Sequence, residues 1–495
     1  MKKSVKGIIG LCAVLAVLGG GLAVLKLTEP EEKEESSVST EAVEGAGIVL
    51  IKDEEVSKAS VTRAEDTLKV VQLTAKTEES ATTYTLEGYE DIPLVTSVVG
   101  TLVNNAKGLQ SSQLVAENCT ELAKYGLEKP VITVELTYES GETAVLEIGD
   151  TAPVASETYV KVKGEDDVYT VATSKVANYS MELEGFISST ILEEPAEEDY
   201  PIVNSLRIQR DDIDYDIYIE YDKKSEDDDY TSGTSATHIL IEPIFSYLNV
   251  DQSAPITNGL FGLSSDGIFS IHADEADIAE AGLNDPFCTV TMSCDDGNDY
   301  VFLMSEPFSD ENGVTSHYGM FENSNMIYIV SAENAKWGTV MPVDIASKIM
   351  FGTYVWNITE LTASGKDAET SEFVITHKAD AEEANNSAHF DTTRNGETFD
   401  TERYRQFYQF LVSAPAEDFA MGEEIPASEP IAVIEHNDYY TQQTNKIEFY
   451  EYSALKSLVV VNGEARFFCS KSYAETVLEN IKRIESGEDY ITTWK

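Results

Sequence analysis

Internal repetition is the feature that most constrains how this chain can fold. The segment YGLEKP at residues 125–130 recurs as AGLNDP at residues 281–286, so both copies contain a Gly-Leu pair followed three residues later by proline. A recurring segment of this kind is the signature of a structural unit that the chain uses more than once. We therefore expect tandem modules rather than one large core.

The residues after this element keep the same register in both copies. Residues 131–136 alternate between apolar and polar side chains and reach a turn at Ser140-Gly141, and residues 287–293 do the same before a turn at 296–298. Alternation with a period of two followed by turn residues indicates β-hairpins. The sequence thus predicts paired strands at equivalent places in two modules.

Tyrosine pairs follow these hairpins at matching positions. Tyr159 and Tyr169 recur as Tyr318 and Tyr328 with the same spacing. Exposed tyrosines would favour a carbohydrate-binding surface, whereas equivalent repeat positions favour packing inside each unit. We interpret these rings as structural.

The repeat extends upstream and appears a third time. Residues 57–61 and 204–208 each open a pair of strands, and a third copy begins near residues 356–361, continues through a strand at 431–435 and reaches a hairpin turn at 461–463. Helical spacing follows the opening strands of the first and third copies, whereas Gly259 and Gly262 weaken the helix in the second. The residues with this spacing are Leu94, Val98, Leu102 and Leu109 in the first copy, where Thr96 or Ser97 is expected as the cap, and Tyr404, Phe407, Tyr408 and Leu411 in the third.

These patterns predict the α+β class, with three tandem repeats that each hold antiparallel strands, one main helix and a short closing helix such as residues 474–484. The expected organisation is a cytoplasmic tail at 1–6, a transmembrane anchor at 7–27, an acidic disordered tether at 28–46, and repeat modules at 47–195, 200–350 and 355–490.

The amino terminus indicates a membrane anchor. Residues 7–25 carry no charge and follow Lys2, Lys3 and Lys6. As a helix this run would span roughly 28 Å, close to the thickness of a bilayer core, and the preceding lysines favour an amino end in the cytoplasm. The exit from the run lacks a small-x-small cleavage site, and Cys12 lies in its middle after Leu11, so an uncleaved anchor is favoured over a signal peptide or a lipid attachment. We expect a single-pass protein of the cell membrane whose bulk is extracytoplasmic.

Composition excludes some partners. The net charge of -55 repels phosphate backbones, so nucleic acid is excluded as a partner. Cations and basic proteins remain compatible partners. The simplest reason for such a charge is solubility.

The cysteines are expected to be unpaired. Cys288 and Cys294 lie on one expected strand, about 20 Å apart at strand rise, which is beyond disulfide reach. Cys119 and Cys469 are also interpreted as unpaired, and the oligomeric state is left open.

The sequence contains no nucleophile elbow, zinc-protease or phosphate-loop motif. We therefore assign no catalytic, cofactor-binding or metal-ligating residue. The histidines are interpreted as ordinary surface or strand residues, because none has a metal-ligand spacing with another histidine or cysteine; they are His238, His272, His317, His377, His389 and His436.

An acidic cluster offers one alternative. Asp212, Asp214 and Asp216 are expected on one strand face, and residues 226–229 crowd the loop beyond the partner strand. Such carboxylates would suit calcium, whereas the simpler interpretation is a solvated hairpin.

The order of a strand pair, a helix, a Y-G-L-x-x-P element, the G-x-x-x-x-L-x-I-G segment at residues 141–149 and paired tyrosines resembles the bacterial domain-of-unknown-function 4340 family. The first copy, residues 56–180, matches best, and the second has Phe302-Leu303-Met304-Ser305 in place of the I-G ending. The resemblance implies a membrane-anchored repeat protein associated with ABC exporters of the gliding-motility auxiliary type, without catalytic residues to carry over.

Three functions remain at this stage. The first is a non-enzymatic, membrane-anchored accessory, scaffold or binding subunit of an ABC-type export system, whose partner is the transporter permease or another envelope protein. The second is a cell-envelope hydrolase or transferase with a site between modules. The third is a cation-dependent adhesion or carbohydrate-binding surface protein.

Overall fold

The computed structural model describes residues 46–77, 80–153, 156–226, 235–378, 390–438 and 442–494. The chain divides into two compact units, Met1–Phe186 and Ile187–Lys495, which are described separately. The expected cytoplasmic tail and anchor, and the tether up to residue 45, lie outside the described residues. Within the described ranges, the structure contains no helix of sufficient length and apolarity to cross a bilayer.

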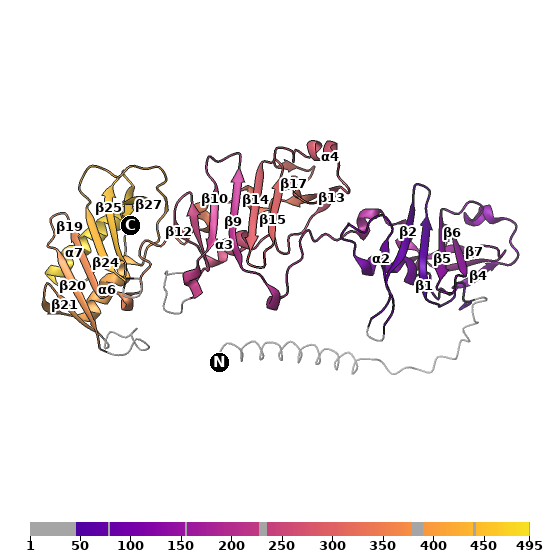
Figure 1. The fold of residues 1–495 in the computed structure, drawn as a ribbon, viewed down its shortest axis with the longest axis horizontal. Helices are drawn as coiled ribbons and strands as arrows, with labels where there is room; N and C mark the ends of the chain where they lie inside the picture. The colour runs from indigo at the N-terminus through magenta and orange to yellow at the C-terminus, as the bar shows by residue number, and fades with distance from the viewer. Residues whose placement is uncertain are drawn as a thin grey trace, which may run out of the picture. The chain divides into compact units, whose positions relative to one another are not determined.

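The first unit holds an eight-stranded antiparallel sheet in the order β3-β2-β1-β5-β6-β7-β8-β4 (Figure 1). Its strands are β1 (Val56–Thr62), β2 (Thr67–Thr74), β3 (Thr83–Leu86), β4 (Gln113–Ala116), β5 (Ile132–Tyr138), β6 (Thr143–Thr151), β7 (Glu157–Val162) and β8 (Val168–Ala172).

The second unit begins with a ten-stranded sheet in the order β12-β11-β10-β9-β14-β15-β17-β18-β13, with β16 paired to β17. Its strands are β9 (Val203–Arg210), β10 (Ile217–Tyr221), β11 (His238–Glu242), β12 (Ser246–Tyr247), β13 (Gly267–Ser270), β14 (Cys288–Cys294), β15 (Asp299–Met304), β16 (Phe308–Ser309), β17 (Thr315–Phe321) and β18 (Ile327–Ser331).

A nine-stranded sheet completes the second unit in the order β22-β21-β20-β19-β24-β25-β26-β27-β23. Its strands are β19 (Glu360–Gly365), β20 (Ser371–His377), β21 (Phe390–Arg394), β22 (Glu397–Phe399), β23 (Asp418–Phe419), β24 (Ala432–Asn437), β25 (Thr444–Glu451), β26 (Lys456–Val461) and β27 (Glu464–Ser470).

The three sheets follow one circuit. In each, the first strand pairs with the fifth, the second and third extend the sheet on one side, the sixth to eighth extend it on the other, and the fourth closes the far edge. The second and third sheets each add a short strand, β12 or β22, beside the third strand of the circuit, and the second also adds β16 beside β17. The expectation of an α+β chain with three antiparallel repeats is therefore confirmed, including the third copy.

One main helix follows the opening strands of each repeat. The described helices are α2 (Thr96–Asn104), α3 (Val250–Thr257), α4 (Glu275–Glu280), α5 (Pro342–Ile345), α6 (Thr401–Leu411) and α7 (Lys471–Ser486). The expected α6 face is confirmed, because its four predicted residues are all buried. In the second repeat, where Gly259 and Gly262 weakened the expectation of a helix, α3 is nevertheless present and ends at Thr257.

Short 3₁₀ turns connect several of these elements. They are η1 (Leu122–Tyr125), η2 (Thr173–Lys175), η3 (Ala177–Ser180), η4 (Leu183–Phe186), η5 (Glu197–Asp199), η6 (Lys223–Glu226), η7 (Lys336–Gly338) and η8 (Val355–Asn357).

The predicted cap and the predicted limits of the first helix were wrong. Helix α2 is capped by Val95, which is extended and makes no side-chain capping bond, so Thr96 and Ser97 lie inside the helix. Leu94 and Leu109, which were expected on its face, lie outside it. The backbone N–H of Val95 donates to the carbonyl of Phe186 at 2.8 Å, which fixes the start of the helix by a long-range contact that local capping rules do not include.

A long closing helix is present only in the third repeat. Helix α7 has a serine N-cap at Ser470, a left-handed glycine at Gly487 and a buried face that includes Tyr473, Val477 and Ile481. The first repeat closes with η2, η3 and η4, and the second with η7 and α5. The prediction of a short closing helix in every repeat was therefore wrong for the first, which closes with 3₁₀ turns, whereas the second has the one-turn helix α5.

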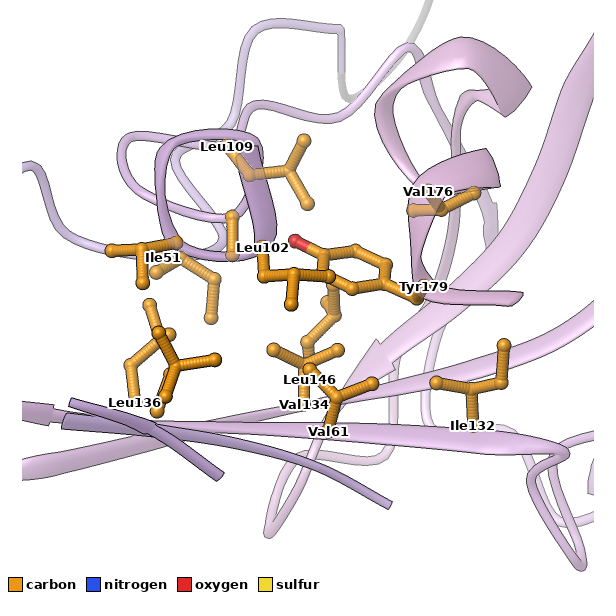
Figure 2. Close-up of a cluster of buried hydrophobic side chains, with 14 of the residues drawn as sticks. Ile51, Val61, Leu102, Leu109, Ile132, Val134, Leu136, Leu146, Val176 and Tyr179 are labelled. Carbon is orange, nitrogen blue, oxygen red and sulfur yellow. The ribbon is translucent and has the colours of Figure 1, made fainter. Parts of the chain in front are cut away.

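The core of the first unit lies between its sheet and the helical segments. Figure 2 shows Leu102 of α2 and the ring of Tyr179 above Val61, Val134 and Leu146, which rise from the sheet. All five side chains are at most 1% exposed. Each buried aliphatic side chain contributes roughly 1.5–3 kcal/mol relative to an exposed one, so this layer holds the unit together.

The repeated Gly-Leu element has the same structure in both copies. Gly126 and Gly282 adopt φ values of 69° and 72°, in the left-handed region that favours glycine. Leu127 and Leu283, which follow them, are each 2% exposed. The two leucines are therefore equivalent and buried.

The tyrosine pairs are also equivalent. Tyr169 of β8 lies opposite Val160, and Tyr328 of β18 lies opposite Gly319, at matching positions of the seventh and eighth strands. Phe468 of β27 occupies this place in the third repeat, opposite Leu458. All three rings are buried, so they act as packing residues.

We predict that Leu127→Asp destabilises the first unit by about 3 kcal/mol, because a carboxylate would be forced into an apolar site. Limited proteolysis should then degrade residues 46–186 while fragments of residues 187–495 stay protected. Leu73→Asp is the matched control, since Leu73 is 56% exposed in the same unit. Simultaneous loss of protection in both units would contradict the division of the chain into two separately stable units.

Candidate functional site

A polar cavity of about 280 Å³ lies in the second unit, where the edge of its first sheet meets the strands of its second. The residues that line it from the first of these sheets include Asp222, Lys224 and Phe245, and those from the second include His436, Asp438 and Arg466. None of these residues was predicted as a site.

The segment between the two sheets is bonded to both of them. The N–H of Ser347 donates to the carbonyl of Tyr247 at 2.9 Å, and the N–H of Ala416 donates to the carbonyl of Lys348 at 2.8 Å. The hydroxyl of Tyr408, in α6, donates to the carbonyl of Thr353 at 2.6 Å. These bonds fix the floor of the cavity, which residues 349, 350, 352 and 353 line.

His436 supplies a buried imidazole. It lies on β24, is 2% exposed, and its ring packs edge-to-face with Tyr408 at 6.2 Å. Its Nδ1 is 3.2 Å from the carbonyl oxygen of Asn437, whereas its Nε2 has no hydrogen-bond partner in the part of the chain that the structure describes. Burial lowers the pKa of His436 below its ordinary value of 6.5, so the ring is neutral at pH 7.

The tautomer follows from these contacts. A carbonyl oxygen only accepts hydrogen bonds, so Nδ1 must carry the proton and donate it to Asn437. The neutral ring then has its lone pair on Nε2. Nε2 of His436 is therefore a buried acceptor that has no partner among the described residues.

Arg466 supplies a cation to the lining of the same cavity. It lies on β27, and its guanidinium carbon is 5.3 Å from the ring centroid of Phe245. Its Nη2 donates to Glu464 at 3.1 Å, and its Nε has no partner among the described residues. The stacking on Phe245 is a cation–π contact between the two sheets of this unit.

Two carboxylates complete the charged lining. Asp222 is 8% exposed and follows β10, where its Oδ1 accepts the N–H of Lys224 at 3.1 Å and opens η6. Asp438 is 4% exposed and follows β24. With Lys224 and Arg466, the four ionised groups of the lining sum to zero.

The predicted acidic face of residues 212–216 was wrong. Residues 211–215 form the turn between β9 and β10, so Asp212, Asp214 and Asp216 do not share a strand face. Arg210 binds both oxygens of Asp212 at 2.7 and 2.8 Å, which lowers the pKa of that carboxyl, and Arg207 binds Asp216 at 2.7 Å. The side chains of Asp212 and Asp216 point toward these arginines, because each carboxylate gains a charge-assisted hydrogen bond from its arginine.

No group of three or more metal-ligating side chains gathers among the described residues. Glu226 ends η6, and residues 227–229 of the same predicted cluster lie outside the described ranges.

The other predicted features have ordinary environments. His317 is 1% exposed, with its Nδ1 2.7 Å from the carbonyl oxygen of Ser305 and its ring stacked on Phe287. His238 begins β11 and His377 ends β20, while His272 lies between β13 and α4; His389 falls outside the described residues. The expectation of free thiols is confirmed for Cys119, Cys288, Cys294 and Cys469.

A protein-family model matches part of the chain. The model described as "Domain of unknown function (DUF4340)" matches residues 85–252, from β3 of the first repeat to α3 of the second. The resemblance to this family is thereby confirmed for that stretch. No curated protein and no solved structure matches the chain.

We predict that His436 titrates below pH 6.5 in the folded chain. As the pH falls, the unfolded chain takes up a proton at this histidine at a higher pH than the folded chain does. The contribution of His436 to stability is therefore present above pH 6.5 and is lost as the pH falls through the lower pKa of the folded chain. Histidine-selective NMR, with His436→Phe to assign the signal, measures the midpoint. A midpoint at or above 6.5 would contradict the buried environment.

Proposed function

We propose that this chain, whose residues 85–252 match the DUF4340 family, is a non-enzymatic, membrane-anchored repeat protein that acts outside the cytoplasm as a scaffold or binding subunit of an ABC-type export system. The observation that carries the proposal is the threefold use of one strand circuit. Three modules with one strand order offer a partner the same kind of sheet surface more than once.

An open polar face supports a binding role. On the third sheet, β19, β24 and β25 line an open hollow of about 850 Å³. Its charged side chains include Glu435, Glu448 and Lys446, and the last two form an ion pair at 2.9 Å. The opposite face of the sheet packs on α7, so the polar face is the one that remains to meet a partner.

The anchor is supported by the sequence alone. The uncharged run at residues 7–25 and the lysines before it favour a single crossing with the modules outside. The net charge of -55 suits a partner with basic or polar segments rather than an anionic one.

The second candidate function is a cell-envelope hydrolase or transferase, and the cavity around His436 is the observation that favours it. A catalytic histidine is commonly oriented by a carboxylate at Nδ1. Here Nδ1 donates to the carbonyl oxygen of Asn437 instead of to a carboxylate. The scaffold role is therefore preferred.

Topology is tested by labelling with a membrane-impermeant thiol reagent in intact cells. We expect Ser37→Cys to be modified and Ser4→Cys to be protected, because residues 7–27 would separate the two positions. Cys12→Ser and Cys119→Ser should be present in both variants, since Cys119 is partly accessible and Cys12 lies in the expected anchor. Modification of Ser4→Cys alone would refute the orientation.

The partner is tested by crosslinking in membranes of cells whose neighbouring genes encode an ABC exporter. We expect the chain to recover a transporter subunit, and Glu435→Lys to reduce the recovery because it reverses a charge on the open face. Glu397→Lys is the control, since Glu397 is exposed on β22, outside that face. Repeated failure to recover any transporter subunit would refute the exporter role.

A further inference from the structure

The second repeat covers the outer face of its sheet with a helix of its own. On that face Leu303 of β15 and Met320 of β17 belong to a small apolar cluster. Ile278 of α4 and Leu283, which follows α4, pack in the same cluster. The apolar side chains of this face are therefore shielded by the segment that contains the repeated Gly-Leu element.

The third repeat has a corresponding cluster under a different cover. The cover is residues 418–430, which comprise β23 and the turns after it; all of these residues are described, and they form no helix. The cluster consists of Ala420 of the cover and four residues of β25, β26 and β27, which are Tyr450, Leu458, Val460 and Phe468.

The alignment of the repeats shows what this cover has lost. The proline of the repeated element stands two residues before the fifth strand in all three repeats, and in the third it is Pro430. Three residues before that proline, the first two repeats have Leu127 and Leu283, each 2% exposed. The third repeat has Ala427 there, which is exposed. The third cover thus has neither the helix nor the buried leucine.

Apolar side chains remain exposed in the two segments beside the cluster. Tyr452, in the turn between β25 and β26, joins these segments, because its ring packs on Phe468 at 4.6 Å and its hydroxyl donates to Glu423 of the cover at 2.9 Å. We call the exposed side chains the outer patch: Met421 and Ile425 of the cover, each 40% exposed, and Tyr452 and Leu455 of the turn, 46% and 79% exposed. Exposed apolar groups gathered in this way mark interaction surfaces.

Carboxylates surround the outer patch. In the cover and in the turn at residues 451–456, the only cation is Lys456, which pairs with Asp418 at 3.7 Å. Four carboxylates are in excess over this pair, and they are Glu423, Glu424, Glu429 and Glu451. Glu429 and Glu451 also line the open hollow of about 850 Å³ on the same sheet.

The charge selects the occupant of the outer patch. A second copy of this chain, with its net charge of -55, and an anionic membrane would both be repelled, whereas a basic segment would be attracted. The second repeat covers the same face with a helix. A helix with an apolar stripe flanked by lysine or arginine therefore matches both the shape and the charge of the surface.

We propose that the outer patch is the docking site for a basic amphipathic helix of a partner protein, whose apolar stripe packs on the patch and whose cationic side chains face the surrounding carboxylates. The proposal rests on the proposed binding role and names the chemistry of the partner. It does not require that the partner is an exporter.

The ligand side is tested by fluorescence anisotropy on the full chain in a neutral detergent, with the detergent alone as the baseline. The probe is a labelled leucine-lysine peptide of about four helical turns whose leucines fall on one face. We expect it to bind about tenfold more tightly than a peptide of the same composition with its leucines spread around the helix. Equal binding of the two peptides, or no binding above the baseline at about 0.1 mM, would overturn the proposal.

The apolar contacts are tested by a double variant of the outer patch. Leu455→Gln combined with Ile425→Gln should weaken binding of the leucine-lysine peptide about tenfold, because both side chains would lose apolar burial. Val412→Gln combined with Leu73→Gln is the matched control, since these side chains are 45% and 56% exposed and lie outside the patch. Equal weakening by the two double variants would contradict the assigned surface.

The charge contacts are tested by removing two of the carboxylates. Glu423→Gln combined with Glu424→Gln should weaken peptide binding at low salt and reduce its salt dependence, because screening acts on exposed charges. Glu397→Gln combined with Glu485→Gln removes two exposed carboxylates outside the cover and the turn, and should have a smaller effect. An equal effect of both pairs would mean that only the net charge of the chain attracts the peptide, which would overturn the site.

Failure of this proposal can be distinguished from failure of the exporter role. Peptide binding that the patch variants leave unchanged would overturn the docking site, even if crosslinking recovers a transporter subunit. Peptide binding that depends on the patch, without recovery of a transporter subunit, would support the docking site and refute the exporter role alone.

Discussion

Each module depends on the antiparallel pairing of its first strand with its fifth. These pairs are β1 with β5, β9 with β14, and β19 with β24, and each joins segments separated by a long excursion of the chain. Closing such an excursion costs conformational entropy that grows slowly with its length. Burial offsets that cost, because the excursion carries the helix that covers the sheet, as α2 does over β1, β2 and β3. The central pair therefore fixes both halves of the sheet and the helix between them.

The cavity is a consequence of the same pairing. In β24 the inward positions are Ala432, Ile434 and His436, so the last one places an imidazole where the first two place core aliphatics. The register sets His436 opposite Leu361 on one side and Asn445 on the other. Because the strand ends there, the ring lies at the margin of the core and lines the cavity with Arg466 and the segment that leads from the preceding sheet. A shift of one residue would turn it to the opposite face.

Local patterns predicted much of the fold and little of the site. The turn at Asn462-Gly463 was predictable because both residues adopt positive φ, 53° and 86°, as this hairpin type requires. The cap at Val95 was not predictable, because it depends on a backbone hydrogen bond to the distant Phe186. The turn at 211–215 was not predictable either, because ion pairs with Arg207 and Arg210 hold its carboxylates. The cavity joins Asp222 to residues around 436 and 466, and no local spacing indicates that proximity. His436 looked ordinary because its place in the cavity wall is set by tertiary packing and not by any local spacing.

Amide hydrogen exchange tests the central claim most directly, because it measures the stability of each strand pair separately. In all three modules, the slowest amides should belong to the first and fifth strands of the circuit, and those of the edge strands β3, β12 and β22 should exchange faster. The same ranking in all three sheets would support one shared design. Edge strands as slow as the central pair, or one central pair as fast as its own edge, would contradict it.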